Sequence, residues 1–188
     1  MKEILNLIKE RRSVRDFSEK SISEEDILTI FEGARWAPSS YNGQPWKYIY
    51  AEKNRNPELH ETLLNILESF NQAWAKAAPL IIIAMANTKY DKTGVENKHS
   101  WYDLALSVEN MCLVAESLDI STHQITGFDV EKAKTNLNIP SDFTPVVMIA
   151  MGYYEKTGNL PLDVYKMENI DRVRKDVCEF ILDKKFDE

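Results

Sequence analysis

The sequence predicts a layered domain of helices and strands, of the α+β or α/β class, from three observations. Apolar residues recur at helical spacing in several segments, strongly apolar runs of strand length occupy residues 79–87 and 144–154, and the two patterns alternate. A length of 188 residues suits one domain, which buries roughly 70% of its unfolded surface. We therefore expect one domain over residues 1–188, with 155–188 as a C-terminal extension.

The first predicted elements are two helices joined by a basic segment. Apolar positions within residues 4–8 predict a short amphipathic helix that ends near Arg11. Residues 11–20, RRSVRDFSEK, follow as a loop or extended piece. Ser23, with Asp26 three positions later, is an N-cap signature and begins the second helix.

The middle of the chain is predicted to pair two strands with a long helix. Residues 47–53, KYIYAEK, have a strand pattern. Asn56 and Pro57 begin a helix whose apolar positions continue to Trp74. Residues 79–87, PLIIIAMAN, form a buried strand.

The second half begins with a polar, irregular segment at residues 88–98. A central helix over roughly residues 99–119 is apolar on more than one face, and a short strand then leads to a turn at Gly127. Asp129 can cap a further helix, and residues 144–154 are another buried strand. The tail is predicted to end in a helix that uses Ile170, Val173, Val177, Phe180 and Ile181.

Composition narrows the class of protein. Apolar residues make up 44% and charged residues 28%, which is typical of a globular chain. The net charge of −7 argues against a nucleic-acid binder that relies on overall basicity. Cys112 and Cys178 have no disulfide or zinc spacing, and the run PLIIIAMA is too short to span a bilayer. We expect a cytoplasmic protein with no membrane span.

A search for familiar catalytic patterns finds none. His60, His99 and His123 lack metal-ligand spacing, and we interpret them as packing or surface residues without a metal. The sequence contains neither a GxSxG elbow nor a GxGxxG or GxxxxGK[ST] loop. Any bound phosphate must therefore be held by side chains.

RRSVR, residues 11–15, is one candidate for such a site. Arg11 and Arg15 could converge on one phosphate through bidentate hydrogen bonds, and Ser13 adds a neutral donor. The same letters also fit a solvated basic turn near a helix C-terminus.

WAPSSYNGQPW, residues 36–46, is the other candidate. Its small donors and acceptors suit the edge of a flat polar molecule, with prolines and the bulky Trp36 and Trp46 stiffening a preformed wall. The alternative is an ordered Ω-like loop whose tryptophans belong to the core and whose polar groups satisfy the local backbone.

These segments resemble the nitroreductase family of FMN-dependent oxidoreductases, in spacing as well as in letters. The resemblance extends over nearly the whole chain. It is carried by RRSVRDF, EGARWAPSSYNGQPW, NQAWAKAAPLIIIAMA, SVENMCLVAESLDI, ITGFD and TPVVMIAMGYY.

The resemblance implies an α+β three-layer sandwich with a mixed central sheet and a C-terminal arm. It also implies a homodimer with one FMN in each of two interface clefts, both lined by the two chains. The implied activity is hydride transfer from NAD(P)H through flavin N5 to nitroaromatic, quinone or related acceptors by a ping-pong mechanism. The flavin carries the chemistry, so no catalytic side chain is expected.

Carried over position by position, the resemblance assigns cofactor-binding residues. One subunit would contact the phosphate, ribityl chain and pyrimidine edge with Arg11, Arg12, Ser13 and Arg15. The partner would close the site with Pro38, Ser39, Ser40, Asn42 and Gln44. Asn71 matches a flavin-ring contact, and the turn whose backbone N–H reaches N5 matches Thr126 and Gly127.

Two positions depart from the family pattern. Asn159 stands where a tail arginine is expected in the phosphate clamp, and Lys156 is the nearby cation, slightly out of register. Trp74 stands where some members have a lysine near the ring. The altered tail clamp keeps open the alternative of a flavin-binding protein for storage or sensing. A plain anion-binding module that uses RRSVR is another alternative, which the net charge of −7 disfavours.

Overall fold

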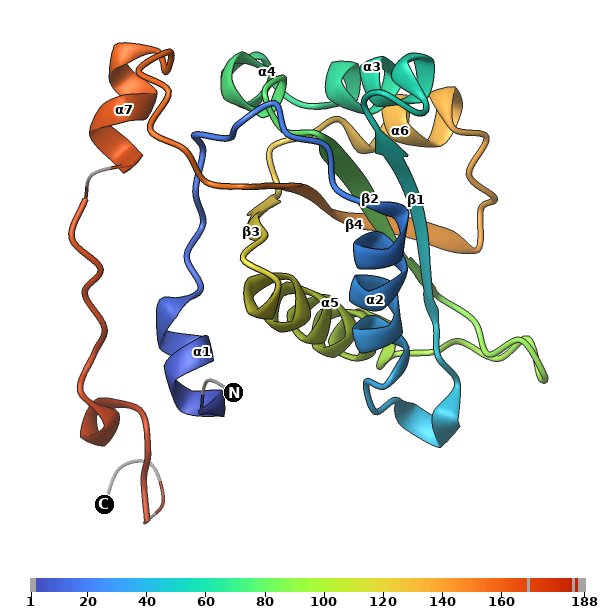
Figure 1. Ribbon diagram of the computed structural model, residues 1–188. Coiled ribbons are helices and arrows are strands. Elements are labelled where there is room, and N and C mark those ends of the chain that lie inside the picture. The colour runs from blue at the N-terminus through green and yellow to red at the C-terminus, as the bar shows by residue number, and fades with distance from the viewer. Residues whose placement is uncertain (1–2, 169, 184, 186–188) are drawn as a thin grey trace.

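The computed structural model describes residues 3–168, 170–183 and 185, and it places a β-sheet between two helical layers (Figure 1). The sheet has the strand order β1-β2-β4-β3, with every neighbouring pair antiparallel. Its strands are β1 (Trp46–Glu52), β2 (Leu80–Asn87), β3 (Ser121–Ile125) and β4 (Phe143–Gly152). The helices are α1 (Ile4–Glu10), α2 (Glu24–Arg35), α3 (Pro57–Ile66), α4 (Ser69–Ala75), α5 (Ser100–Ser117), α6 (Val130–Asn136) and α7 (Leu162–Glu168), with 3-10 turns η1 (Ser40–Asn42) and η2 (Val177–Glu179). Within the part of the chain that the structure describes, none of the helices combines the length and the apolar character that crossing a membrane requires.

The core divides along β2, whose residues are all buried. Leu80 and Ile82 face the layer of α2 and α5, whereas Ile81 and Ile83 face the layer of α3, α4 and α6. Burying one such side chain stabilises a fold by about 1.5–3 kcal/mol, so a strand covered on both faces anchors the sheet. This arrangement confirms the predicted α+β class and its layers. The sheet differs from the expected mixed one, because in the described residues its named strands pair only antiparallel and the parallel pairing is an isolated bridge between Ser13 and Thr122.

Helix starts follow the predicted caps. The Ser23 hydroxyl accepts a hydrogen bond from the Asp26 backbone N–H at 3.0 Å and begins α2. Asn56 precedes Pro57 and caps α3 in the same way. The Asp129 carboxylate accepts from the Lys132 N–H at 2.9 Å and begins α6. Each cap satisfies a backbone donor that the helix itself leaves unpaired.

The long helix predicted from Pro57 to Trp74 is wrong, because the chain leaves the helix at Leu67 and begins α4 at Ser69. Leu67 instead forms an antiparallel bridge with Phe128. The Glu68 N–H donates to the Gly127 carbonyl at 3.0 Å. Pairing with this distant turn competes with local helix propensity, and it fixes the turn in place.

The long tail helix is also wrong. α7 ends at Glu168, and residues 170–176 are irregular. Val173 and Phe180 are 80% and 65% exposed, so the expected apolar stripe has no core to pack on within the described chain. A short helix without packing is marginal in water. Of the predicted extension, residues 169, 184 and 186–188 lie outside the described residues.

The tail after α7 and the helix α1 lie side by side along one flank of the molecule (Figure 1). The Arg172 guanidinium donates to the Lys9 carbonyl at 2.5 Å. Most of α1 is exposed, including Ile4 at 76%. Both segments therefore present apolar side chains outward from the same flank.

Candidate functional site

The segment RRSVR runs along the β3 edge of the sheet, where Ser13 forms a parallel bridge with Thr122. Val14 and Phe17 are each 1% exposed and pack into the core, which fixes the backbone between them. Arg11, Arg12, Ser13 and Arg15 consequently lie together at the surface of this edge, and we call them the basic cluster.

Arg15 is half-buried and is incompletely paired. Its backbone N–H donates to Glu168 Oε2 at 3.0 Å, but its nearest guanidinium nitrogen to that oxygen, Nη1, is 3.8 Å away. Its Nε is buried without a hydrogen-bond partner among the described residues. The guanidinium also lies 5.9 Å from the centre of the Trp74 ring. A buried donor without an acceptor is costly, which favours an additional acceptor here.

Burial lowers the pKa of Arg15 and raises the pKa of Glu168, opposed in each case by their mutual attraction. Both shifts express the same physical cause, since low-dielectric surroundings disfavour either charged form. An anion placed beside Arg15 would favour its charged form.

A cavity of about 560 Å³ opens over the basic cluster. Its walls come from both ends of the chain and comprise Arg11, Arg12, Ser13, Arg15, Met167, Glu168, Ile170, Asp171, Arg172, Val173 and Arg174. Arg12 Nη2 donates to the Glu168 carbonyl at 2.9 Å, and Arg11 Nε lies 3.8 Å from Glu109 Oε1. The arginines of RRSVR thus share one cavity instead of pointing separately into solvent.

Asn71 and Gly127, each of which the resemblance assigns to the flavin, lie in contact with each other. Asn71 Nδ2 donates to the Gly127 carbonyl at 3.0 Å. A Cβ at position 127 would lie 2.5 Å from Asn71 Nδ2 and 2.9 Å from Glu68 Oε2. Glycine is therefore what allows Asn71 to reach this turn, while the neighbouring Thr126 is exposed.

Trp74, which stands where some members have a lysine, lies in the core. It is 1% exposed and packs against Phe17 and against His123, whose ring centre is 4.6 Å away. His123 Nδ1 is 2.8 Å from the Val14 carbonyl. Burial, with the charge of Arg15 as a second cause, lowers the pKa of His123 to about 4. A neutral His123 ring therefore packs against the backbone of the RRSVR segment.

Residues 38–44, Pro38 to Gln44, form a loop that leads from α2 to β1, and we call it the 38–44 loop. The Ser40 N–H donates to Asp103 Oδ2 at 3.0 Å, and the Gln44 N–H donates to Ser39 Oγ at 3.0 Å. Positive φ angles occur at Tyr41, Asn42 and Gln44, at 53°, 53° and 45°. Such backbone is unusual outside glycine and persists when surrounding contacts enforce it. Pro38 and the side chains of Asn42 and Gln44 are left exposed.

The expected role of the tryptophans is wrong for Trp36. It is 72% exposed, donates from Nε1 to Glu32 Oε1 at 2.7 Å, and lies under the Arg35 guanidinium. Trp46 begins β1 and packs partly against the core. The loop is held by a hydrogen bond from the Ser40 N–H to Asp103 and by hydrogen bonds within the loop, instead of by a pair of core tryptophans.

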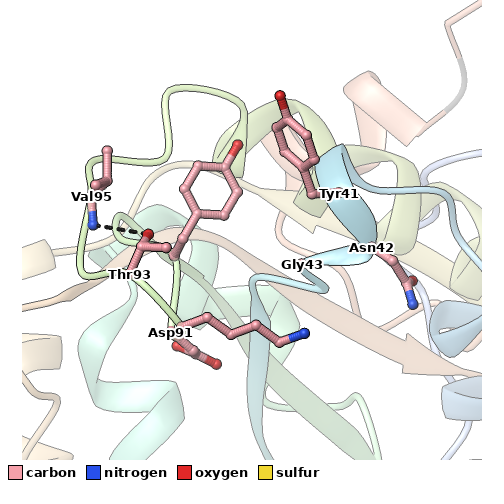
Figure 2. A pocket seen from close by; sticks show the side chains of 8 residues that line it. Tyr41, Asn42, Gly43, Asp91, Thr93 and Val95 are labelled. Atoms are coloured by element: carbon pink, nitrogen blue, oxygen red, sulfur yellow. Dashed lines mark hydrogen bonds between the residues drawn. The ribbon is translucent and has the colours of Figure 1, made fainter.

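A second cavity, of about 440 Å³, lies between the 38–44 loop and the segment after β2. Figure 2 shows Tyr41, Asn42 and Gly43 on one side and Asp91, Thr93 and Val95 on the other. The Tyr41 and Tyr90 rings meet edge to face at 6.1 Å, and Tyr90 Oη donates to Ser40 Oγ at 3.1 Å. We did not predict from the sequence that the segment after β2 lines a cavity. The sequence signal for it was Tyr90 and Val95 within the otherwise polar residues 88–98.

The basic cluster and the 38–44 loop lie at opposite edges of the sheet. The cluster bridges β3, whereas the loop leads into β1, and two strands separate these edges (Figure 1). Within one chain the structure therefore brings the cluster toward Asn71 and Gly127 through their shared helical layer, but it does not bring the 38–44 loop to them.

Lys156 lines a cavity with Arg12 of the basic cluster, whereas Asn159 lies on a turn beside Thr157. Lys156 lines an adjoining cavity of about 470 Å³ together with Arg12 and Arg172. The Asn159 N–H donates to Thr157 Oγ1 at 3.2 Å, and the side chain is exposed. Thr157 is held in turn by Asp16.

Comparison with known proteins gives a consistent result. A sequence model described as the nitroreductase family matches residues 8–153. An Archaeoglobus fulgidus protein provisionally named NADH dehydrogenase/NAD(P)H nitroreductase is 30% identical over 158 residues, which cover 81% of this chain and 86% of the relative.

Solved structures share the fold. A structure described as an oxidoreductase containing FMN superposes with a TM-score of 0.89 at 25% identity, covering 96% of this chain and 91% of that one. A nitroreductase family protein from Clostridium novyi NT superposes with a TM-score of 0.69 at 28% identity, covering 81% of this chain and 87% of that one.

Proposed function

Because the chain belongs to the nitroreductase family, we propose that it is an FMN-dependent oxidoreductase that moves hydride from NAD(P)H to flat acceptors such as nitroaromatics and quinones. The superposed oxidoreductase that contains FMN and the relative named for NAD(P)H support this proposal. The observation that carries it is the basic cluster, whose arginines share one cavity with the unpaired Arg15 Nε.

The residues present fit FMN. The cavity over the basic cluster offers guanidinium donors for a phosphate, and the acceptor that Arg15 Nε lacks is what an anionic ligand supplies. At the predicted ring contact, a side chain at position 127 would collide with Asn71 and Glu68, so glycine keeps Asn71 against this turn. Arg11, Arg12, Ser13 and Arg15 would hold the phosphate, ribityl chain and pyrimidine edge, and the ring would meet Asn71, Thr126 and Gly127. When bound, FMN supplies the hydride chemistry.

We also propose that the site is completed by a second copy of the chain. In this arrangement the partner's loop contributes Pro38, Ser39, Ser40, Asn42 and Gln44. The opposite placement of the two regions supports this, since one chain cannot apply both to the same flavin. The outward apolar side chains of α1 and the tail offer surface for an obligate interface, which typically buries roughly 2,000 Å² or more.

The protein's part in the reaction is positioning and electrostatics. Arg15 places a fixed positive charge where negative charge would accumulate, and the preformed 38–44 loop orients flat reactants. One pocket over the ring would hold NAD(P)H and the acceptor in turn, so turnover should be ping-pong with loose acceptor selectivity.

The test begins with FMN added to the purified full-length chain, followed by NADH or NADPH without oxygen. The proposal predicts a bound flavin spectrum that bleaches with a nicotinamide and returns with a quinone. Initial rates should give parallel double-reciprocal lines. Intersecting lines would contradict the ping-pong order, and bound FMN that neither nicotinamide bleaches would favour storage or sensing. A chain that binds no FMN would leave only the anion-binding module.

A further inference from the structure

The irregular tail after α7 lines part of the cavity over the basic cluster. Arg172 and Arg174 line this cavity together with Arg11, Arg12 and Arg15. The two tail arginines also line a neighbouring cavity of about 460 Å³ beside Arg11. The hydrogen bond from Arg172 to the Lys9 carbonyl ties the tail to the end of α1. Residues more than 150 positions apart in sequence thus border one space.

The charges around this space do not balance. Five arginines and two carboxylates, Glu168 and Asp171, line the cavity, in a chain whose net charge is −7. Burial lowers the pKa of Arg172, and the like charges of Arg174, Arg11 and Arg12 lower it further, against a smaller opposing effect of Glu116. Several cations gathered against an overall acidic chain repel one another unless an anion lies among them.

This chain lacks a cation at one position where the resemblance implies one. The resemblance places an arginine of the phosphate clamp at position 159, where this chain has an asparagine whose exposed side chain lies on a turn held by Thr157. Lys156 reaches the adjoining cavity, and Arg172 lines that cavity as well. Arg172 therefore borders all three of these cavities between the basic cluster and the tail.

We propose that Arg172 and Arg174 complete the binding site for a phosphate monoester, the phosphate of FMN, in place of the cation absent at Asn159. This inference rests on the proposed function. The tail would then contact the cofactor directly, in addition to any role at a subunit interface. The position of the tail would also depend on whether the cofactor is bound. Two guanidinium groups suit a phosphate dianion because each can donate in a bidentate manner.

The test compares two flavins that differ only in the phosphate. FMN and riboflavin are titrated into the apo form of the full-length chain and of the Arg172→Ala/Arg174→Ala variant, with flavin fluorescence as the readout. FMN affinity should fall roughly tenfold to a hundredfold, as expected for lost charge-assisted hydrogen bonds, and riboflavin affinity should stay unchanged. Lys175→Ala, which removes a tail cation outside the cavity lining, is the matched control and should bind both flavins normally.

Unchanged FMN affinity in the double variant would overturn the inference, and so would equal weakening of FMN and riboflavin, which indicates loss of structure. If the alanine pair does not fold, the Arg172→Gln/Arg174→Gln and Arg172→Lys/Arg174→Lys pairs decide the matter. The lysine pair should keep most of the preference for FMN over riboflavin and the glutamine pair should lose it. A wild-type chain that binds neither flavin would overturn the proposed function too, whereas tight FMN binding in wild type and variants alike would overturn this inference alone.

Discussion

The basic cluster and the 38–44 loop differ in what holds them and in what they offer a ligand. The cluster is anchored by buried Val14 and Phe17 and presents charged guanidinium groups to a cavity. The loop is held by hydrogen bonds to Asp103 and within itself, and it presents exposed neutral side chains. The cluster therefore suits an anion, and the loop suits the neutral hydrogen-bonding edge of a ring.

This difference explains why neither region alone identifies the ligand. Arginines at a sheet edge fit many phosphates, and a polar loop with positive φ angles fits many flat molecules. A flavin mononucleotide needs both chemistries within one ligand, which the opposite edges of a single chain do not offer. Variants of the charged region and of the neutral region should therefore behave differently.

The largest effect is expected at the charged region. Arg11→Ala and Arg15→Ala should each weaken FMN binding roughly tenfold to a hundredfold, because each removes a charge-assisted hydrogen bond of about 1.5–3 kcal/mol. The measurement is FMN titration of the apo variants at low and high salt, with the weakening smaller at high salt. Arg35→Ala, which removes an exposed arginine paired with Glu32, is the control and should bind normally. If both cluster variants bind FMN with normal affinity, RRSVR is a surface turn that does not contact the cofactor.

The next effect concerns the buried support of the cluster. The pKa of His123 is lowered to about 4 from an ordinary 6.5, so the unfolded chain binds its proton more readily. Stability from this group is fully present above pH 6.5 and is lost as pH falls toward 4. Between pH 7 and pH 5 the loss should be about 2 kcal/mol of unfolding free energy.

Urea unfolding at both pH values checks this figure. His123→Asn keeps a side-chain donor near the Val14 carbonyl but does not titrate, so this part of the pH dependence should disappear in the variant. His99→Asn changes an exposed histidine and should leave the dependence as it is in the wild type. If the unfolding free energy of His123→Asn depends on pH as steeply as that of the wild type, a buried neutral His123 is not the cause of the pH dependence.

The smallest effect is expected at the neutral region. Ser40→Ala removes an uncharged hydroxyl that accepts from Tyr90, and FMN affinity should fall only about twofold to tenfold. Salt should hardly change that ratio, in contrast to the arginine variants. If Ser40→Ala loses as much FMN affinity as Arg15→Ala, and with the same dependence on salt, the distinction between a charged and a neutral region is wrong.

Local chemistry made much of this molecule predictable. The caps at Ser23, Asn56 and Asp129 were visible because a cap and its target lie within a few residues. The strands at residues 80–87 and 143–152 were visible because burial on both faces leaves a continuous apolar run.

Two errors came from partners distant in sequence. The helix break at Leu67 depends on the bridge to Phe128. The exposed Trp36 is a different case, because its indole donates to Glu32, four residues earlier on the same helix. The tail arginines Arg172 and Arg174 drew no attention because their pattern read as helix, and only the folded chain places them beside RRSVR.

The central claim is that the charged region of one chain and the neutral region of its partner form one flavin site, and mixed dimers test it most directly. One variant carries Arg11→Ala/Arg15→Ala, and the other carries Asn42→Asp/Gln44→Glu, which adds negative charge to the exposed loop while keeping side-chain size. Each homodimer should bind FMN poorly. Co-expressed with different tags and purified through both, the heterodimer has one doubly defective site and one intact site, so it should bind one FMN per dimer with wild-type affinity. Poor binding in the heterodimer, as poor as in either homodimer, would contradict a site shared between subunits.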